Sequence, residues 1–116
     1  MISSKGIQER EALSCVGDGW ACLIDRFYTE IAKSDVSVCV LQVKEKFGGL
    51  RIYWEAEGKD IDYSKKKLRD IRDFIDKLSE ESRNICESCG RGGKIHMHKS
   101  WLKVSCDDCY REWIET

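Results

Sequence analysis

Four cysteines in the last third of the chain have the spacing of a metal site. They form two Cys-x-x-Cys pairs that are separated by sixteen residues, and the members are Cys86, Cys89, Cys106 and Cys109. Each pair can form a tight knuckle that directs both thiolates at one point, and sixteen residues suffice for a hairpin that joins the knuckles. The pattern predicts a closed tetrahedral site with four sulfur ligands, which suits a structural Zn²⁺.

The other three cysteines bear on the redox environment. Two disulfides are the alternative to a metal site, but nothing else in the sequence marks the chain as secreted. Cys15, Cys22 and Cys39 stand in apolar contexts and are predicted to be buried free thiols, which is typical of a reducing compartment. We find no signal peptide and no membrane-spanning stretch, so we expect a cytoplasmic protein with no membrane contact.

The sequence offers little for catalysis. His96 and His98 are its only histidines, and it contains no nucleophile elbow and no phosphate-binding glycine pattern. Metal-dependent nucleases of the HNH class hold a ββα unit between two such cysteine pairs, so a nuclease is our third hypothesis. However, neither histidine follows an Asp or precedes an Asn, and sixteen residues are short for that unit. We therefore expect a protein that is not an enzyme.

A nucleic-acid-binding zinc ribbon is our second hypothesis. Residues 83–104 carry five basic side chains and one acidic side chain, a net charge of +4, together with an aromatic residue. Positive charge beside an aromatic side chain is typical of nucleic-acid-binding modules. Against this hypothesis, residues 105–116 have a net charge of −3 and the whole chain has a net charge of −1. The candidate contacts are Arg91, Lys94, Lys99 and Trp101.

A protein-binding module is our first hypothesis, and a Gly-Gly turn flanked by cations is its candidate surface. Lys44 and Lys46 lie on one face of the strand before the turn, and Arg51 can reach them from the strand after it. These cations could receive a phosphate or the carboxylates of a partner, or they could be plain solvated charge above a tucked-in Phe47. Tryptophan and tyrosine dominate binding hot spots, and the chain has four of each. The predicted partner-binding residues are Lys44, Lys46, Phe47, Arg51 and Trp101.

Two amphipathic helices are expected to position these residues. Apolar side chains recur at helical spacing over residues 18–33, and Asp18 is the predicted N-cap. The same spacing recurs over residues 61–83, where Asp60 or Asp62 can serve as the cap. Charged residues cover the outer face of this long helix, as in a solvated surface helix.

Two hairpins complete the predicted elements. Runs rich in β-branched and aromatic residues over 36–46 and 51–57 predict two strands joined by a turn at Gly48 and Gly49. Between the cysteine pairs, residues 96–104 can supply a second hairpin. A short closing helix or tail is expected over residues 110–114.

The resulting fold class is α+β: helix, β-hairpin, long helix and a C-terminal four-cysteine zinc ribbon. We predict a small domain over residues 1–84 and a ribbon over residues 85–116 that packs on the long helix as part of one folding unit. A chain of 116 residues with 41% apolar residues supports only a modest core, to which a metal would add folding free energy.

Five short motifs resemble a group of small uncharacterised bacterial, phage and prophage proteins. They span about residues 17–109 and are Gly17-Asp18-Gly19-Trp20, Val43-Lys44-Glu45-Lys46-Phe47-Gly48-Gly49-Leu50-Arg51, Cys86-x-x-Cys89-Gly90, Trp101-Leu102 and Cys106-Asp107-Asp108-Cys109. The resemblance implies the context of a mobile genetic element. It would make the protein a phage-encoded inhibitor of host defence or an immunity protein that neutralises a toxin, and both bind proteins.

Overall fold

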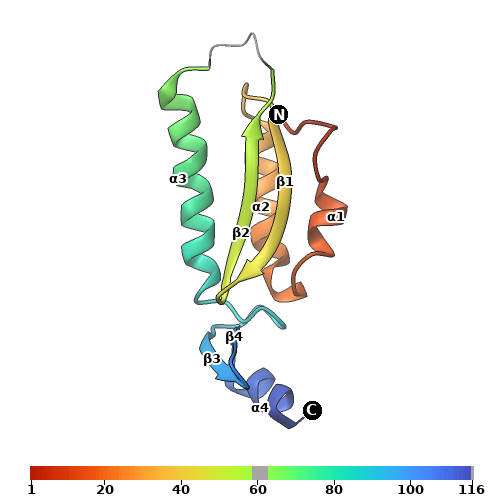
Figure 1. The fold of residues 1–116 in the computed structure, drawn as a ribbon, viewed down its shortest axis with the longest axis vertical. Helices are drawn as coiled ribbons and strands as arrows, with labels where there is room; N and C mark the ends of the chain where they lie inside the picture. The colour runs from red at the N-terminus through yellow and green to blue at the C-terminus, as the bar shows by residue number, and fades with distance from the viewer. Residues whose placement is uncertain (59–62, 116) are drawn as a thin grey trace.

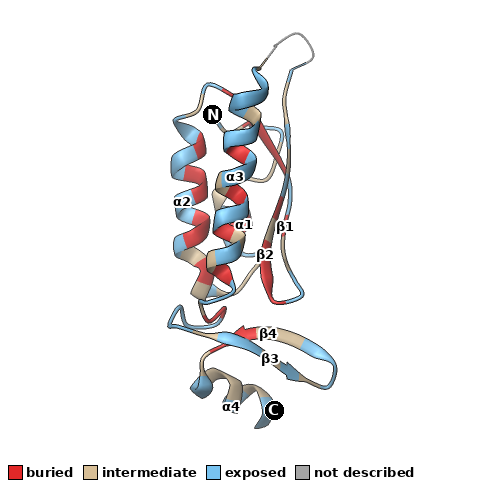
Figure 2. Ribbon diagram, turned by 90° about the vertical axis from the view of Figure 1, so that its left-hand side faces the viewer, coloured by how far each residue is buried: buried red, intermediate tan, exposed pale blue. Residues whose placement is uncertain are grey.

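The computed structural model describes residues 1–58 and 63–115. It confirms the predicted α+β class: helix, hairpin, long helix and a C-terminal hairpin that carries the four cysteines. The molecule is elongated, 53 × 24 × 23 Å, and the C-terminal hairpin lies across the turn of the first hairpin at one end (Figures 1 and 2). The elements are α1 (Glu9–Leu13), a 3₁₀ turn η1 (Asp18–Trp20), α2 (Ala21–Ala32), β1 (Val38–Lys46), β2 (Gly49–Ala56), α3 (Lys65–Ser82), β3 (Lys94–His98), β4 (Trp101–Ser105) and α4 (Asp107–Glu115).

The main core lies between the β1–β2 sheet and the helices α2 and α3, which cover the same face of the sheet (Figure 2). Trp20 of η1 and Phe27 of α2 belong to one buried cluster with Leu50 of β2 and Leu78 of α3, and all four side chains are fully buried. Burying each such side chain contributes roughly 1.5–3 kcal/mol. The core extends into the ribbon (residues 85–115) through the buried Val104 of β4.

The β1–β2 turn lies one residue earlier than the sequence predicts. Lys46 pairs with Gly49, so the two turn residues are Phe47 and Gly48, with φ angles of 52° and 82°. This is the backbone of a type I′ turn, in which both central residues have positive φ. A turn shifted by one residue would move Leu50 from the buried face of the sheet to solvent, so burial of β2 determines the register.

The first predicted helix start is also wrong. The α-helix begins at Ala21 after the 3₁₀ turn, and the side chain of Asp18 caps neither segment. The backbone N–H of Gly19 instead donates to the carbonyl of Glu87, 2.7 Å away in the ribbon. This tertiary hydrogen bond determines the local conformation, and no local pattern reveals it.

The long helix begins later than predicted. It starts at Lys65 rather than near residue 61, and the Ser64 hydroxyl caps it by accepting a hydrogen bond from the backbone N–H of Lys67 at 3.2 Å. Serine is among the preferred N-cap residues. The predicted caps, Asp60 and Asp62, lie outside the described residues.

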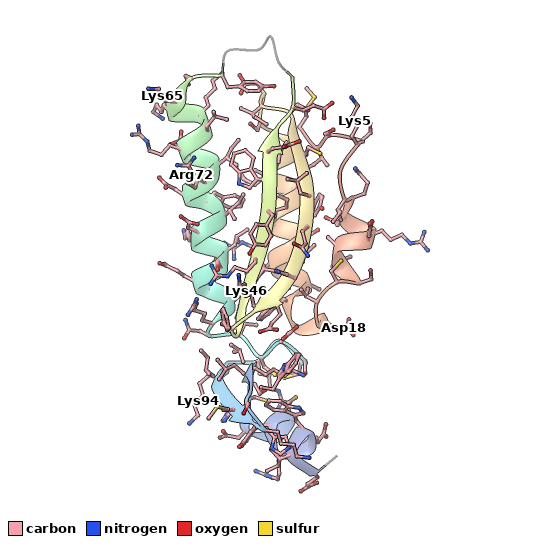
Figure 3. The ribbon with its side chains drawn as sticks, viewed as in Figure 1. Lys5, Asp18, Lys46, Lys65, Arg72 and Lys94 are labelled. Carbon is pink, nitrogen blue, oxygen red and sulfur yellow. The ribbon has the colours of Figure 1, made fainter. Side chains whose placement is uncertain are left out.

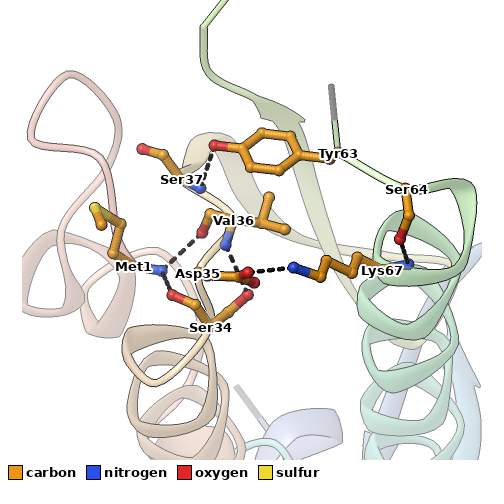
Figure 4. Close-up of polar contacts among 8 residues, drawn as sticks. All are labelled: Met1, Ser34, Asp35, Val36, Ser37, Tyr63, Ser64 and Lys67. Atoms are coloured by element: carbon orange, nitrogen blue, oxygen red, sulfur yellow. Dashed lines mark hydrogen bonds and ion pairs between the residues drawn. The ribbon is translucent and has the colours of Figure 1, made fainter. Parts of the chain in front are cut away.

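Polar contacts join the start of this helix to the α2–β1 connection (Figure 4). The Tyr63 hydroxyl accepts a hydrogen bond from the backbone N–H of Ser37 at 3.0 Å, and Lys67 pairs with Asp35. Lys67 thereby lowers the pKa of the Asp35 carboxyl. The amino group of Met1 donates to two carbonyls of the same connection, at 2.5 and 2.7 Å. These contacts lie at the end of the molecule opposite the ribbon.

Two of the three remaining cysteines are not buried as predicted. Cys39 is buried, but Cys15 and Cys22 are exposed. Cys22 lies on the solvent side of α2, because the apolar stripe of that helix begins with Leu23 and Ile24. The argument for a reducing compartment from buried thiols therefore rests on Cys39 alone. Within the described part of the chain, no helix is long and apolar enough to cross a membrane.

A buried serine links α3 to the sheet. The hydroxyl of Ser82 accepts a hydrogen bond from the backbone N–H of Leu50 at 2.9 Å and donates to the carbonyl of Ser79 at 2.5 Å. We expect Ser82→Ala to lower the free energy of unfolding by about 1–3 kcal/mol, because a buried N–H group loses its acceptor. Urea unfolding measures the change. Ser79→Ala on the same helix is the control, and equal effects of the two substitutions would contradict the prediction.

Candidate metal centre

The structure brings the four predicted cysteines together in the ribbon, with the first pair beside the Gly17–Trp20 segment. Cys86 and Cys89 lie in the loop after α3, Cys106 follows β4, and Cys109 lies in the first turn of α4. The pairing of β3 with β4 places the two knuckles side by side. Gly90 closes the first knuckle with a φ of 85°, and its N–H donates to the carbonyl of Cys86 at 2.9 Å.

The distances between the sulfur atoms suit a tetrahedral ion. All four Sγ atoms lie within 4.8 Å of one another, and those of Cys89 and Cys106 are 3.7 Å apart. A tetrahedral ion with metal–sulfur bonds of about 2.3 Å requires sulfur–sulfur separations of about 3.8 Å. A disulfide would need about 2.05 Å, and all four cysteines are free. The cluster could therefore hold a metal ion such as zinc.

The electrostatics of the cluster favour a bound cation. Burial raises the pKa of the Cys86 thiol, but hydrogen bonds from the backbone N–H groups of Cys106, Cys89 and Ser88 outweigh it and lower that pKa to about 6. The pKa of Cys109 is raised by its hydrogen bond with Cys106 and by burial. Neighbouring thiolates repel one another, so protons stay on some sulfurs until a divalent cation compensates for the charge.

The loop that carries Cys86 and Cys89 packs against the Gly17–Trp20 segment. The backbone N–H groups of Gly17 and Gly19 donate to the side chain and the carbonyl of Glu87, at 3.1 and 2.7 Å. The indole N–H of Trp20 donates to the carbonyl of Ile85 at 2.9 Å. The sequence predicts a ribbon that packs on the long helix. That packing stays a prediction, and the ribbon contacts described here are with this segment and with the β1–β2 turn.

The backbone of the cysteine loop approaches the Gly17–Trp20 segment so closely that positions 17 and 19 require glycine. A Cβ atom on Gly19 would lie 2.0 Å from the carbonyl oxygen of Cys86, and one on Gly17 would lie 2.3 Å from that of Glu87. Both distances are far below van der Waals contact, so any side chain would push the knuckle away. The Gly-Asp-Gly-Trp motif thus has a structural role: it holds the loop that carries two of the sulfur ligands.

The two histidines pack against α4. His96 stacks on Tyr110 with 4.0 Å between ring centroids, and His98 meets Trp113 edge-to-face at 5.4 Å. The Nε2 atom of His96 lies 4.0 Å from a carboxylate oxygen of Asp107. Within residues 1–58 and 63–115, the cysteine cluster is the one group placed to hold a metal ion, and neither histidine belongs to it.

The predicted partner-binding residues occupy two neighbouring surfaces. Lys44 and Arg51 lie opposite each other in the β1–β2 register. Arg51 also lines a separate cavity against α3, together with Asp76, Ser79, Glu80 and Arg83. The side chain of Phe47 is 65% exposed, so it is not tucked under the turn. Trp101 is also 65% exposed, at the tip of the β3–β4 hairpin.

The two hairpins meet at a cleft. A Cβ atom on Gly48 would lie 3.3 Å from Ile95 of β3, so the β1–β2 turn packs directly on the ribbon. Beside this contact lies the two-turn cleft, with a volume of about 340 Å³ and a lining of Glu45, Lys46, Phe47, Ser100, Trp101 and Leu102. The cleft unites two surfaces that the sequence leaves separate.

Sequence reasoning also misses Ile95 and Met97, which are 43% and 63% exposed. The one sequence signal for this apolar surface is that Ile95 and Met97 alternate with polar residues along the short strand β3.

Comparison with known proteins finds no family model, no curated protein and no solved structure that matches the chain. The resemblance to small phage and prophage proteins therefore stays a prediction. Function has to be argued from the geometry of the cysteine cluster and of the two-turn cleft.

We expect Gly19→Ala to destabilise the protein by about 1–3 kcal/mol, as overpacking of a close contact does. Gly92→Ala is the matched control, because no atom lies within 4 Å of a Cβ at Gly92 and its φ is not positive. Urea unfolding followed by tryptophan fluorescence measures both variants. If Gly92→Ala lowers the free energy of unfolding as much as Gly19→Ala does, the contact between Gly19 and the cysteine loop is not tight in solution.

Proposed function

We propose that the chain is a non-enzymatic protein-binding module, with a contact surface built from two hairpin turns and held in place by a structural zinc ion. The observation that carries the proposal is the two-turn cleft. Phe47 and Trp101 come from different hairpins, each side chain is 65% exposed, and both line this cleft. Large aromatic side chains that converge at the surface are typical of protein-binding hot spots.

Backbone strain at the same two turns supports the proposal. The non-glycine residues with positive φ in the described chain are Phe47, Lys99 and Ser100, at 52°, 50° and 68°. This conformation costs a residue with a Cβ atom roughly 1–2 kcal/mol, and type I′ turns prefer Asn-Gly. Phe47 is therefore a poor choice for turn stability. Strained backbone of this kind clusters at ligand-binding sites.

Zinc is the proposed metal, and its proposed role is structural. The β3–β4 hairpin buries Val104 and Ser105, and no residue of α4 is buried. In the loop that leads into this hairpin, Cys86 and Glu87 are also buried. So little apolar burial contributes little folding free energy, whereas four thiolate ligands around zinc would contribute it directly. Four protein ligands leave no open position for substrate, so the ion would hold Trp101 beside Phe47 without taking part in chemistry.

Nucleic-acid binding is the second candidate. One observation favours it: the ammonium group of Lys46 lies 5.7 Å from the centroid of the Phe47 ring, so a cation and an exposed aromatic ring stand together as in a base-stacking platform. On the ribbon, however, Arg91 lies 3.7 Å from Asp108 and is engaged in an ion pair. One of the four predicted nucleic-acid contacts is therefore occupied.

We expect the purified protein to contain about one zinc ion per chain. Cys89→Ser should lose the metal and the circular dichroism of the ribbon, because the tetrahedral set is broken. Cys22→Ser, at an exposed thiol outside the cluster, should keep both. Elemental analysis and thermal melts with and without chelator test the expectation. A metal-free protein with an unchanged melting temperature would exclude a structural ion.

We expect Phe47→Asn to stabilise the fold and abolish partner binding. The substitution creates the preferred Asn-Gly turn, worth about 0.5–1 kcal/mol, and removes one wall of the cleft. The assay captures partners from nuclease-treated host lysate on the zinc-loaded chain, with identification by mass spectrometry. Leu41→Asn is the control, since Leu41 is 52% exposed on β1 and outside the cleft.

The combination of outcomes is decisive. A stoichiometric protein that the parent and Leu41→Asn retain and that Phe47→Asn loses supports the proposed function. A protein retained equally by all three chains places binding elsewhere. Recovery of nucleic acid before digestion, with no protein after it, favours the second candidate.

A further inference from the structure

We propose that the two-turn cleft takes a bulky apolar side chain from an acidic segment of the partner protein. This inference rests on the proposed function and names the chemistry of the ligand. The apolar part follows from the lining of the cleft, and the acidic part follows from the cations around it.

The interior of the cleft suits an apolar side chain. Two aromatic rings, of Phe47 and Trp101, and the side chain of Leu102 contribute to its walls. Its volume of about 340 Å³ falls within the range of small ligand pockets. Exposed Ile95 and Met97 on β3 continue the apolar surface on the ribbon side. An aromatic or leucine side chain inserted here would remove these surfaces from water, as anchors do at hot spots.

The cations around the cleft lack acidic partners. Lys46 lines the cleft, Lys44 lies two residues before it on β1, and Lys99 lies in the turn of the second hairpin. Arg51 is opposite Lys44 in the register and also lines a separate cavity with Asp76 and Glu80 of α3. In the described part of the chain, none of the four has a carboxylate within ion-pair distance. Figure 3 shows Lys46 near the end of the β1–β2 hairpin that faces the ribbon.

The one acid that lines the cleft, Glu45, offsets only one of these four positive charges. A carboxylate oxygen of Glu45 accepts a hydrogen bond from the backbone N–H of Gly48 at 2.7 Å, so that oxygen is engaged within the turn. The chain as a whole has a net charge of −1, and unpaired cations at one surface are therefore a local feature. A partner with complementary charge is acidic around its apolar anchor.

A short acidic peptide segment fits this surface better than a nucleic acid. A nucleic acid continues as a polyanion beyond the cleft, and on the ribbon it would approach Asp107 and Asp108 at the start of α4. The exposed aliphatic side chains of Ile95 and Met97 offer contacts to methyl and aromatic groups but no stacking plane. Cations at one end of the molecule match a few carboxylates rather than a long phosphate track.

The test is a selection from a library of random peptides of about twelve residues, displayed on phage, against the full zinc-loaded chain. We expect enriched peptides to share one Trp, Phe or Leu flanked by Asp or Glu. A synthetic peptide from this set should bind with a Kd weakened about tenfold or more by the pair Lys46→Glu and Arg51→Glu. Lys65→Glu with Arg72→Glu is the matched control, because both residues are exposed on α3 and neither lines the cleft.

Charge exchange separates this inference from the proposed function. Replacing the peptide's acids with Lys should restore binding to the Lys46→Glu, Arg51→Glu chain and abolish binding to the parent. Enriched peptides that lose binding with Phe47→Asn but carry no acids would overturn the acidic partner while leaving protein binding at the cleft intact. Insensitivity to Phe47→Asn, no enrichment, or tighter binding of a single-stranded oligothymidine than of any peptide would overturn both.

Discussion

The contact between the first cysteine knuckle and the Gly17–Trp20 segment is the constraint on which the rest of the structure depends. A hydrogen bond of 2.7 Å joins Gly19 to Glu87, and a second of 2.9 Å joins the indole of Trp20 to Ile85. The same tryptophan is fully buried in the main core. One side chain therefore belongs to the core and also holds the ribbon, so the orientation of the cysteine loop follows from the packing of α2 and α3.

This constraint couples the cysteine cluster to the cleft between the two hairpin turns. The four cysteines fix the ends of the β3–β4 hairpin, and Val104 of β4 is fully buried and belongs to the core cluster. The turn of the first hairpin then packs on Ile95, which leaves Phe47 and Trp101 on either side of one cleft. The position of Trp101 relative to Phe47 thus depends on four cysteines and on Gly17 and Gly19, none of which lines the cleft.

The sequence predicts what local patterns determine and misses what tertiary contacts determine. Spacing alone identifies the four cysteines that gather into one cluster, because two Cys-x-x-Cys pairs allow few other arrangements. Periodicity predicts the helices and strands to within a few residues. It cannot predict that Asp18 lies in a 3₁₀ turn, since Glu87 of the ribbon determines that conformation, or that Phe47 is a turn residue, since burial of Leu50 sets the register. The cleft escapes sequence reasoning because its two walls lie about fifty residues apart.

The conformation of Phe47 links stability to function. A type I′ turn takes Asn-Gly with little strain, yet here a bulky side chain adopts positive φ and leaves 65% of its surface in water. Neither burial nor turn preference accounts for that residue, and the adjacent hairpin repeats the strain at Lys99 and Ser100. Strain that lowers the stability of the free chain can persist where the strained residues serve binding. Such strain at both turns, beside one cleft, supports the proposal that this surface binds a partner.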